Sequence, residues 1–151
     1  MKFRILLITL TAPATIVSAQ IITDWRTAAL TAGSWSYRET PAGSEAVFTD
    51  AGVTRRIVVK CSRATRRVIL SVASPTPAAL MTVSTSEAQR GLSATFDPQG
   101  FQIVAEVGPQ DPLLDAIAMS RGRFSISVPG GAALVVPAWP EIARSIEDCR
   151  L

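Results

Sequence analysis

The sequence of 151 residues contains no histidine and only two cysteines. Without histidine the chain cannot build a Ser-His-Asp or Cys-His nucleophile system, an imidazole zinc site or the usual general base near neutral pH. Two cysteines are too few for a cysteine-rich metal site, and no serine lies in a G-x-S-x-G elbow. We therefore expect no catalytic residues, no metal and no cofactor in a protein that is not an enzyme. A hydrolase that uses only Asp, Glu or Ser remains the minor alternative.

The N-terminal segment has the three parts of a secretory signal. Lys2 and Arg4 precede an apolar run of 13 residues, 5–17, and small residues follow up to Ala19. The run is shorter than the ~20 residues that span a bilayer, so we expect a signal peptide over 1–19 and no membrane-spanning segment. The remainder, 20–151, has the length of a single domain. Export predicts a periplasmic or secreted protein.

Lysine is scarce in the expected mature chain. Cleavage removes Lys2 and Arg4, which leaves 13 basic residues against 12 acidic ones, a net charge of +1, and Lys60 as the single lysine. So small a net charge argues against nucleic acid as a partner.

Alternation of apolar and polar residues begins at Trp35 and recurs about every ten residues, which is typical of an all-β domain. The predicted strands are 35–38, 45–48, 53–61, 66–73, 80–85, 92–96, 101–107, 124–128 and 132–136. We expect Val53 and Phe101 to lie on the inward faces of their strands. The segments 53–61 and 66–73 should form one hairpin, and the last two segments a second.

Helical signals appear only late in the chain. Asp111 and Pro112 have the positions of an N-cap and a first helical residue, and Gly122 is expected to end that helix. A second helix should bury a face that contains Ile142, Ile146 and Cys149, whereas residues 20–33 fit either a short helix or an extended lead-in. We predict a mainly β protein, an antiparallel β-sandwich or partly open barrel of about eight strands, with two short helices near the C-terminus.

The two cysteines, Cys61 and Cys149, are expected on inward-facing surfaces of a strand and a helix. In an exported protein such a pair favours a disulfide. Two separate buried thiols are the alternative. Redox catalysis is not expected, because no C-x-x-C spacing is present.

Six basic residues fall within 13 positions around the first predicted hairpin, and no acid lies among them. Alternation along a strand places Arg56 and Lys60 on one face, and Arg67 can join them across the hairpin. This face is either a binding patch for an anionic surface or polymer, or a solvated face whose like charges prevent edge-to-edge pairing. We favour the solvated face, with weak and salt-sensitive anion contacts.

Two arginines, Arg121 and Arg123, directly follow the first predicted helix. Their simplest role is to bond the free carbonyls at the helix end. Alternatively, their forked guanidinium groups bind a carboxylate or phosphate.

Three motifs resemble small uncharacterised exported proteins of Gram-negative bacteria: MTVSTS (81–86), DPLLDAIAMSRGRF (111–124) and PAWPEIARSIEDCR (137–150). More distantly, the layout is similar to the invasion-associated locus B proteins, which are secreted β-rich modules. This chain departs from them in having only one possible disulfide. The resemblance implies export and a β-rich fold, and it assigns no functional residue.

Two functions fit these observations. The first is an exported, non-enzymatic β-rich module that binds a protein or cell-envelope component. The second is a periplasmic inhibitor or small-ligand carrier whose pocket is anchored by Arg121 and Arg123, with Trp35 or Trp139 as an apolar wall. A filled core would favour the first function, and an enclosed apolar cavity with an arginine at its mouth would favour the second.

The signal-peptide prediction can be checked by the intact mass of the protein recovered from the periplasm. We expect a mature chain that begins at Gln20, because small residues end at Ala19 where signal peptidase cleaves. Recovery of the uncleaved chain from the membrane fraction would contradict export.

Overall fold

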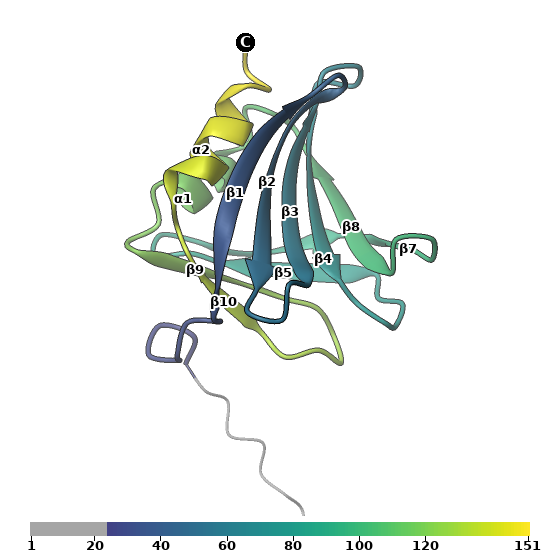
Figure 1. Ribbon diagram of the computed structural model, residues 1–151. Coiled ribbons are helices and arrows are strands. Elements are labelled where there is room, and N and C mark those ends of the chain that lie inside the picture. The colour runs from purple at the N-terminus through teal and green to yellow at the C-terminus, as the bar shows by residue number, and fades with distance from the viewer. Residues whose placement is uncertain (1–23) are drawn as a thin grey trace, which may run out of the picture.

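The structure is a computed structural model that describes residues 24–151 (Figure 1). The expected signal peptide and the Gln20 cleavage site lie outside the described residues. Within them the chain forms two antiparallel sheets and two short helices, so the mainly β sandwich is confirmed. The helices lie together beside β1, and the smaller sheet runs across the lower end of the larger one (Figure 1).

The larger sheet has six strands in the order β1-β2-β3-β4-β8-β7. Its strands are β1 (Gly33–Thr40), β2 (Gly43–Asp50), β3 (Arg55–Ser62), β4 (Arg67–Ala73), β7 (Thr95–Asp97) and β8 (Gln102–Val107). β3 and β4 pair as the predicted hairpin. In β3, Ile57, Val59 and Cys61 are fully buried on one face, so the alternating pattern correctly identified the core side of this strand.

The smaller sheet has four strands in the order β10-β9-β5-β6. These are β5 (Leu80–Ser84), β6 (Gln89–Ser93), β9 (Arg123–Ser127) and β10 (Leu134–Pro137). The second predicted hairpin is confirmed by the pairing of β9 with β10. Trp35 connects the two sheets, because its side chain is buried and its indole N–H donates to the Pro137 carbonyl at 2.9 Å.

Two helices follow the strands as expected. The Asp111 carboxylate accepts from the Leu113 amide at 2.9 Å and caps α1 (Pro112–Ala118). α2 (Pro140–Glu147) packs on β1, β2 and β3 and buries Ile142 and Ile146 completely. No helix among residues 24–151 is both long enough and apolar enough to cross a membrane.

Two predicted boundaries are wrong. The segment 92–96 is not one strand: the chain leaves the four-stranded sheet after β6 and enters the six-stranded sheet at β7, and the Ala94 amide bonds Ala79 between them. α1 ends at Ala118 and not at Gly122, because the buried Ser120 hydroxyl donates to the Arg123 carbonyl and turns the chain into β9. For residues 20–33 the sequence leaves a helix and an extended lead-in open; from Asp24 the chain makes one turn closed on the Asp24 carbonyl and then continues without a helix to β1, which begins at Gly33.

The inward placement of Val53 and Phe101 is also wrong. Val53 is 83% exposed and Phe101 is 63% exposed. Each lies in a turn immediately before a strand, with a left-handed φ of 65° and 48°, respectively. The turn reverses the direction in which the side chain points, so the periodicity of the following strand does not extend to it.

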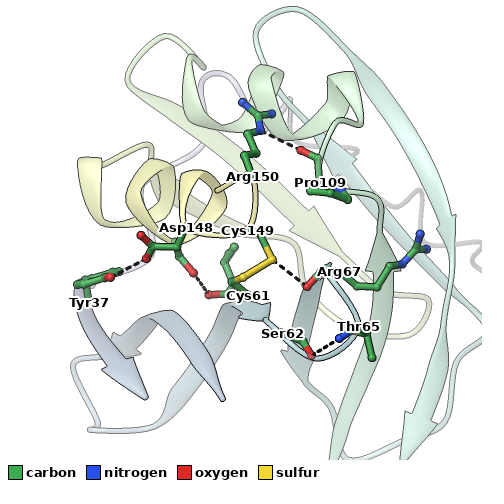
Figure 2. Close-up of a disulfide and its surroundings, with 11 residues drawn as sticks. Tyr37, Cys61, Ser62, Thr65, Arg67, Pro109, Asp148, Cys149 and Arg150 are labelled. Carbon is green, nitrogen blue, oxygen red and sulfur yellow. Dashed lines mark hydrogen bonds between the residues drawn. A yellow bond between two sulfur atoms is a disulfide. The ribbon is translucent and has the colours of Figure 1, made fainter. Parts of the chain in front are cut away.

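The disulfide between Cys61 and Cys149 is confirmed, with Cα atoms 5.2 Å apart (Figure 2). It links β3 to the end of α2. On the same side of α2, Tyr37 of β1 donates its hydroxyl to Asp148 at 2.6 Å (Figure 2). This hydrogen bond raises the pKa of Tyr37 above its usual value. Burial alone would raise the pKa of Asp148, but the bond from Tyr37 and the nearby arginines outweigh burial and lower it.

Removing the disulfide should weaken the attachment of α2. The bond spans 88 residues, and for the Cys61→Ser, Cys149→Ser variant we expect the free energy of unfolding to fall by about 2–4 kcal/mol, since the unfolded chain gains conformational freedom. Hydrogen exchange should rise first in residues 140–151. Thiol titration of the unfolded, unreduced protein is the direct check, and two free thiols per chain would contradict the pairing.

Candidate functional site

The basic side chains of the β3–β4 hairpin lie on the face of the six-stranded sheet opposite the core. Because Ile57, Val59 and Cys61 face inward, Arg56 and Lys60 face outward. Arg67 pairs with Ser62 across the hairpin and therefore shares this outer face. The predicted common face is confirmed.

The outer face contains a hollow of about 510 Å³, which we call the trough. Its floor includes Val58, Ile69 and Val104 from three adjacent strands. Ser71 also faces away from the core, yet it is only 6% exposed. A small side chain among longer neighbours is covered by them, so Ser71 lies at the bottom of the trough.

A register shift between Phe48 and Thr49 on β2 positions two arginines at the end of the trough. Thr49 pairs with Arg55 and Phe48 pairs with Ile57, so Arg56 is the extra residue of a β-bulge. Neighbouring strand residues normally face opposite sides, but at this bulge both arginines line the trough.

The carboxylates of the trough are occupied by neighbouring groups. Glu45 binds Arg38 and also Arg55, the latter at 3.3 Å. Asp97 accepts from the Gln102 amide at 3.1 Å and from the Gln99 backbone at 3.0 Å. The Gln102 bond, together with backbone N–H groups, lowers the pKa of Asp97, so this group stays charged near neutral pH.

Two basic side chains of the trough have fewer partners within the described residues. Lys60 forms no ion pair among residues 24–151. Arg56 lies 3.6 Å from Asp50, and its Nε is buried without a hydrogen-bond partner in the described chain. An apolar floor with incompletely paired cations at its side suits a ligand that is negatively charged and partly apolar.

The structure separates Arg67 from the other two predicted residues of this face. Arg67 lies 3.9 Å from Glu106 and does not line the trough, whereas Arg56 and Lys60 do. Arg55 completes the basic side of the trough. Strict alternation along β3 would put Arg55 on the face opposite Arg56, and no sequence signal marks the bulge that redirects it.

The predicted pair Arg121 and Arg123 lines a second pocket, of about 320 Å³, together with Trp25, Arg26 and Ser86. Trp25 and Arg26 belong to the turn that follows Asp24. The aromatic wall is thus neither Trp35, which is buried, nor Trp139, which lies outside the pocket. The sequence left this N-terminal segment unassigned, so it gave no reason to choose Trp25.

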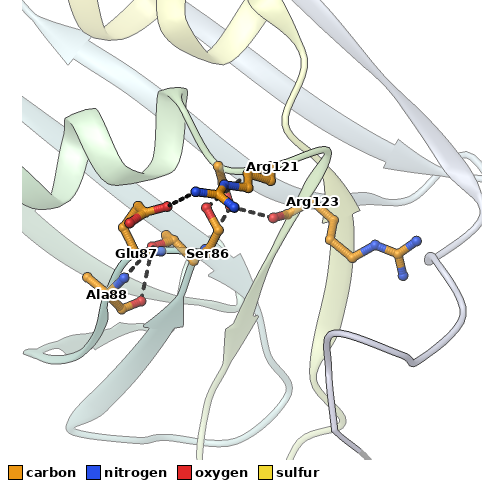
Figure 3. Close-up of polar contacts among 7 residues, drawn as sticks. Ser86, Glu87, Ala88, Arg121 and Arg123 are labelled. Atoms are coloured by element: carbon orange, nitrogen blue, oxygen red, sulfur yellow. Dashed lines mark hydrogen bonds and ion pairs between the residues drawn. The ribbon is translucent and has the colours of Figure 1, made fainter.

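The two arginines of this pocket point away from each other (Figure 3). Arg121 extends toward Glu87 at 3.5 Å and is 85% exposed. The Arg123 guanidinium donates to the Ala28 carbonyl at 2.8 Å. Arg123 therefore fastens the N-terminal segment and does not bond the end of α1, and the pair does not form a two-fork clamp in this arrangement.

The acidic residues of α1 have structural partners. Arg90 lies 2.8 Å from Asp111, and its hydrogen bond lowers the pKa of that carboxyl against the opposing effect of burial. Asp115 pairs with Arg150 at 2.8 Å. Within residues 24–151 no group of three or more Cys, Asp or Glu side chains is placed to bind a metal.

The outer-face cations should contribute little to stability. Arg56 and Arg67 are 38% and 43% exposed and form only long ion pairs, and exposed pairs contribute about 0–1 kcal/mol. The Arg56→Ser, Lys60→Ser, Arg67→Ser variant should therefore melt within a few degrees of the parent in calorimetry. Glu45→Gln gives the contrast, because this carboxylate is 9% exposed and binds two arginines. A larger loss from the triple variant than from Glu45→Gln would contradict a solvated face.

Comparisons of the chain with protein-family models, with curated proteins and with solved structures found no match. The likeness to the invasion-associated locus B proteins therefore depends on the layout of the sequence alone.

Proposed function

We propose that the protein is an exported, non-enzymatic binding module that recognises a protein or cell-envelope component through the trough. The trough is the observation that carries this proposal: an open hollow of about 510 Å³ on a sheet face that no other element covers in residues 24–151. Lys60 supplies a charge without an ion-pair partner in the described chain, and the floor supplies apolar contact area.

The filled interior supports recognition at the surface. The space between the sheets is occupied by large side chains such as Phe48, Phe124 and Met81, each fully buried. Trp35 packs edge-to-face against Phe48 and stacks on Phe124, with ring centroids 5.4 and 6.3 Å away, respectively. A core packed in this way leaves the sheet faces to bind a partner.

The charges of the trough favour an acidic partner. Both of its carboxylates already have partners within the chain, whereas Lys60 and the Nε of Arg56 do not. A negatively charged group entering the trough would pair with Lys60 without displacing an internal ion pair of that residue.

The compartment in this proposal is the periplasm or the exterior of the cell. The disulfide fits an oxidising compartment, and the expected signal peptide would deliver the chain there.

A small-ligand carrier is the second candidate, and the arginine pocket favours it. The pocket brings an indole, three arginines and a serine around about 320 Å³, near the lower end of the ~300–1,000 Å³ range of ligand sites. Arg123 and Arg121 are already bonded to Ala28 and Glu87, so a ligand would have to compete with these contacts. We rank this candidate second for that reason.

Photo-crosslinking in the producing cell tests the first candidate. A benzophenone amino acid in place of Ile69 would project from the trough floor, and one in place of Thr82 would project from the outer face of the other sheet as a control. We expect an adduct from position 69 and none from position 82, because only the trough would contact the partner. Adding Lys60→Glu should reduce the adduct by removing the cation.

The mass of the adduct identifies its class as protein, lipid or glycan. Equal crosslinking from both positions, or none from position 69 in a folded protein, would contradict recognition through the trough.

A further inference from the structure

Two exposed apolar side chains stand at the end of the sheet where the trough begins. Val53 lies in the turn between β2 and β3, and Phe101 lies in the turn between β7 and β8. They are 83% and 63% exposed. Isolated exposed apolar residues are common on protein surfaces. Exposure alone therefore does not indicate a role, and the backbone conformation and location of these two residues have to be considered as well.

The backbone of both residues is unfavourable for the side chains that they carry. Val53 and Phe101 have φ values of 65° and 48°, a left-handed conformation that glycine and asparagine adopt most easily and that β-branched residues resist. Each residue directly follows a glycine, Gly52 or Gly100. Each turn thus has an apolar residue at a position where glycine or asparagine would make the fold more stable. Backbone strain of this kind is concentrated at functional sites.

The two turns lie at the same end of the six-stranded sheet. β2 ends and β3 begins at the first turn, and β7 ends and β8 begins at the second. Only β4 separates β3 from β8, so these two strands are about 10 Å apart at the usual strand spacing, and the centres of the two turns are about 14 Å apart. Figure 1 shows both turns at the end away from the β3–β4 turn.

Two arginines lie close to these apolar side chains. Arg55 and Arg56 follow the first turn directly, and their side chains are 53% and 38% exposed. Arg56 shares a recess of about 240 Å³ with Phe101 and Pro75. The end of the sheet therefore presents apolar tips beside guanidinium groups, a combination that matches the acyl chains and phosphates of an anionic bilayer.

We propose that the partner of the trough is an anionic lipid bilayer, into which Val53 and Phe101 insert while Arg55 and Arg56 bind headgroup phosphates. This inference rests on the proposed binding function and names its partner. Lys60, further along the trough, then meets a headgroup that enters the hollow.

Co-sedimentation with lipid vesicles tests the proposal. The mature, disulfide-bonded protein is mixed with vesicles of phosphatidylglycerol and phosphatidylcholine in equal parts, and with vesicles of phosphatidylcholine alone. We expect binding to the first, weaker binding at high ionic strength, and little binding to the second. Absence of binding to the anionic vesicles at low ionic strength would overturn the proposal.

The Val53→Asn, Phe101→Asn variant separates insertion from folding. Asparagine tolerates the left-handed backbone, so the melting temperature should be unchanged or higher, while the vesicle partition coefficient falls about tenfold for each apolar side chain lost. The matched control is Met119→Asn, since Met119 is 76% exposed at the end of α1 and should not affect binding. A double variant that binds like the parent would overturn insertion.

Charge is tested in the same assay with Arg55→Ser, Arg56→Ser. This variant should lose binding to anionic vesicles, whereas Arg66→Ser, in the β3–β4 turn at the other end of the sheet, should retain it. Loss of binding in both would show a general charge effect and overturn the site. A protein adduct from position 69 without vesicle binding would overturn the lipid partner and leave the proposed function intact. If neither an adduct nor vesicle binding is found, the lipid partner and the proposed function are both overturned.

Discussion

The attachment of α2 to one face of the six-stranded sheet is the constraint on which the rest of the structure depends. The Cys61–Cys149 bond closes a loop of 88 residues and fixes the end of α2 against β3. Ile142 and Ile146 fill the interface, and the Ser145 hydroxyl donates to the Val59 carbonyl at 2.9 Å. A helix and a second sheet cover only this face of the six-stranded sheet. The apolar side chains of its strands are therefore buried on this face.

The opposite face is free to carry charge for the same reason. Strand alternation sends Arg56, Val58 and Lys60 outward wherever Ile57 and Val59 point inward. On this outer face the Arg38–Glu45–Arg55 ion pairs cross three adjacent strands. The trough is therefore the direct counterpart of the covered core face, and its floor and its cations come from the same strands that build the core.

The sequence predicted the features that depend on local pattern. Alternation located the β3–β4 hairpin, Asp111 with Pro112 marked the start of α1, and the apolar spacing of α2 placed Cys149 toward the sheet. It failed where a single residue changes the direction of the chain. Three such features are the bulge at Arg56, the change of sheet at Ala94 and the turn that ends at Val53. Each depends on how strands pair across the fold, and the periodicity of one segment does not show that pairing.

Some of the departures from the sequence pattern lie close together. The misassigned Val53 and Phe101 and the redirected Arg55 all lie at the end of the sheet where the trough opens. Sequences that fold reliably show agreement between local preference and global structure, and departures from that agreement are expected where another requirement competes with stability. A valine in a left-handed turn, 83% exposed, gains neither burial nor favourable backbone geometry. Its apolar surface is what the proposed insertion into an anionic bilayer would use.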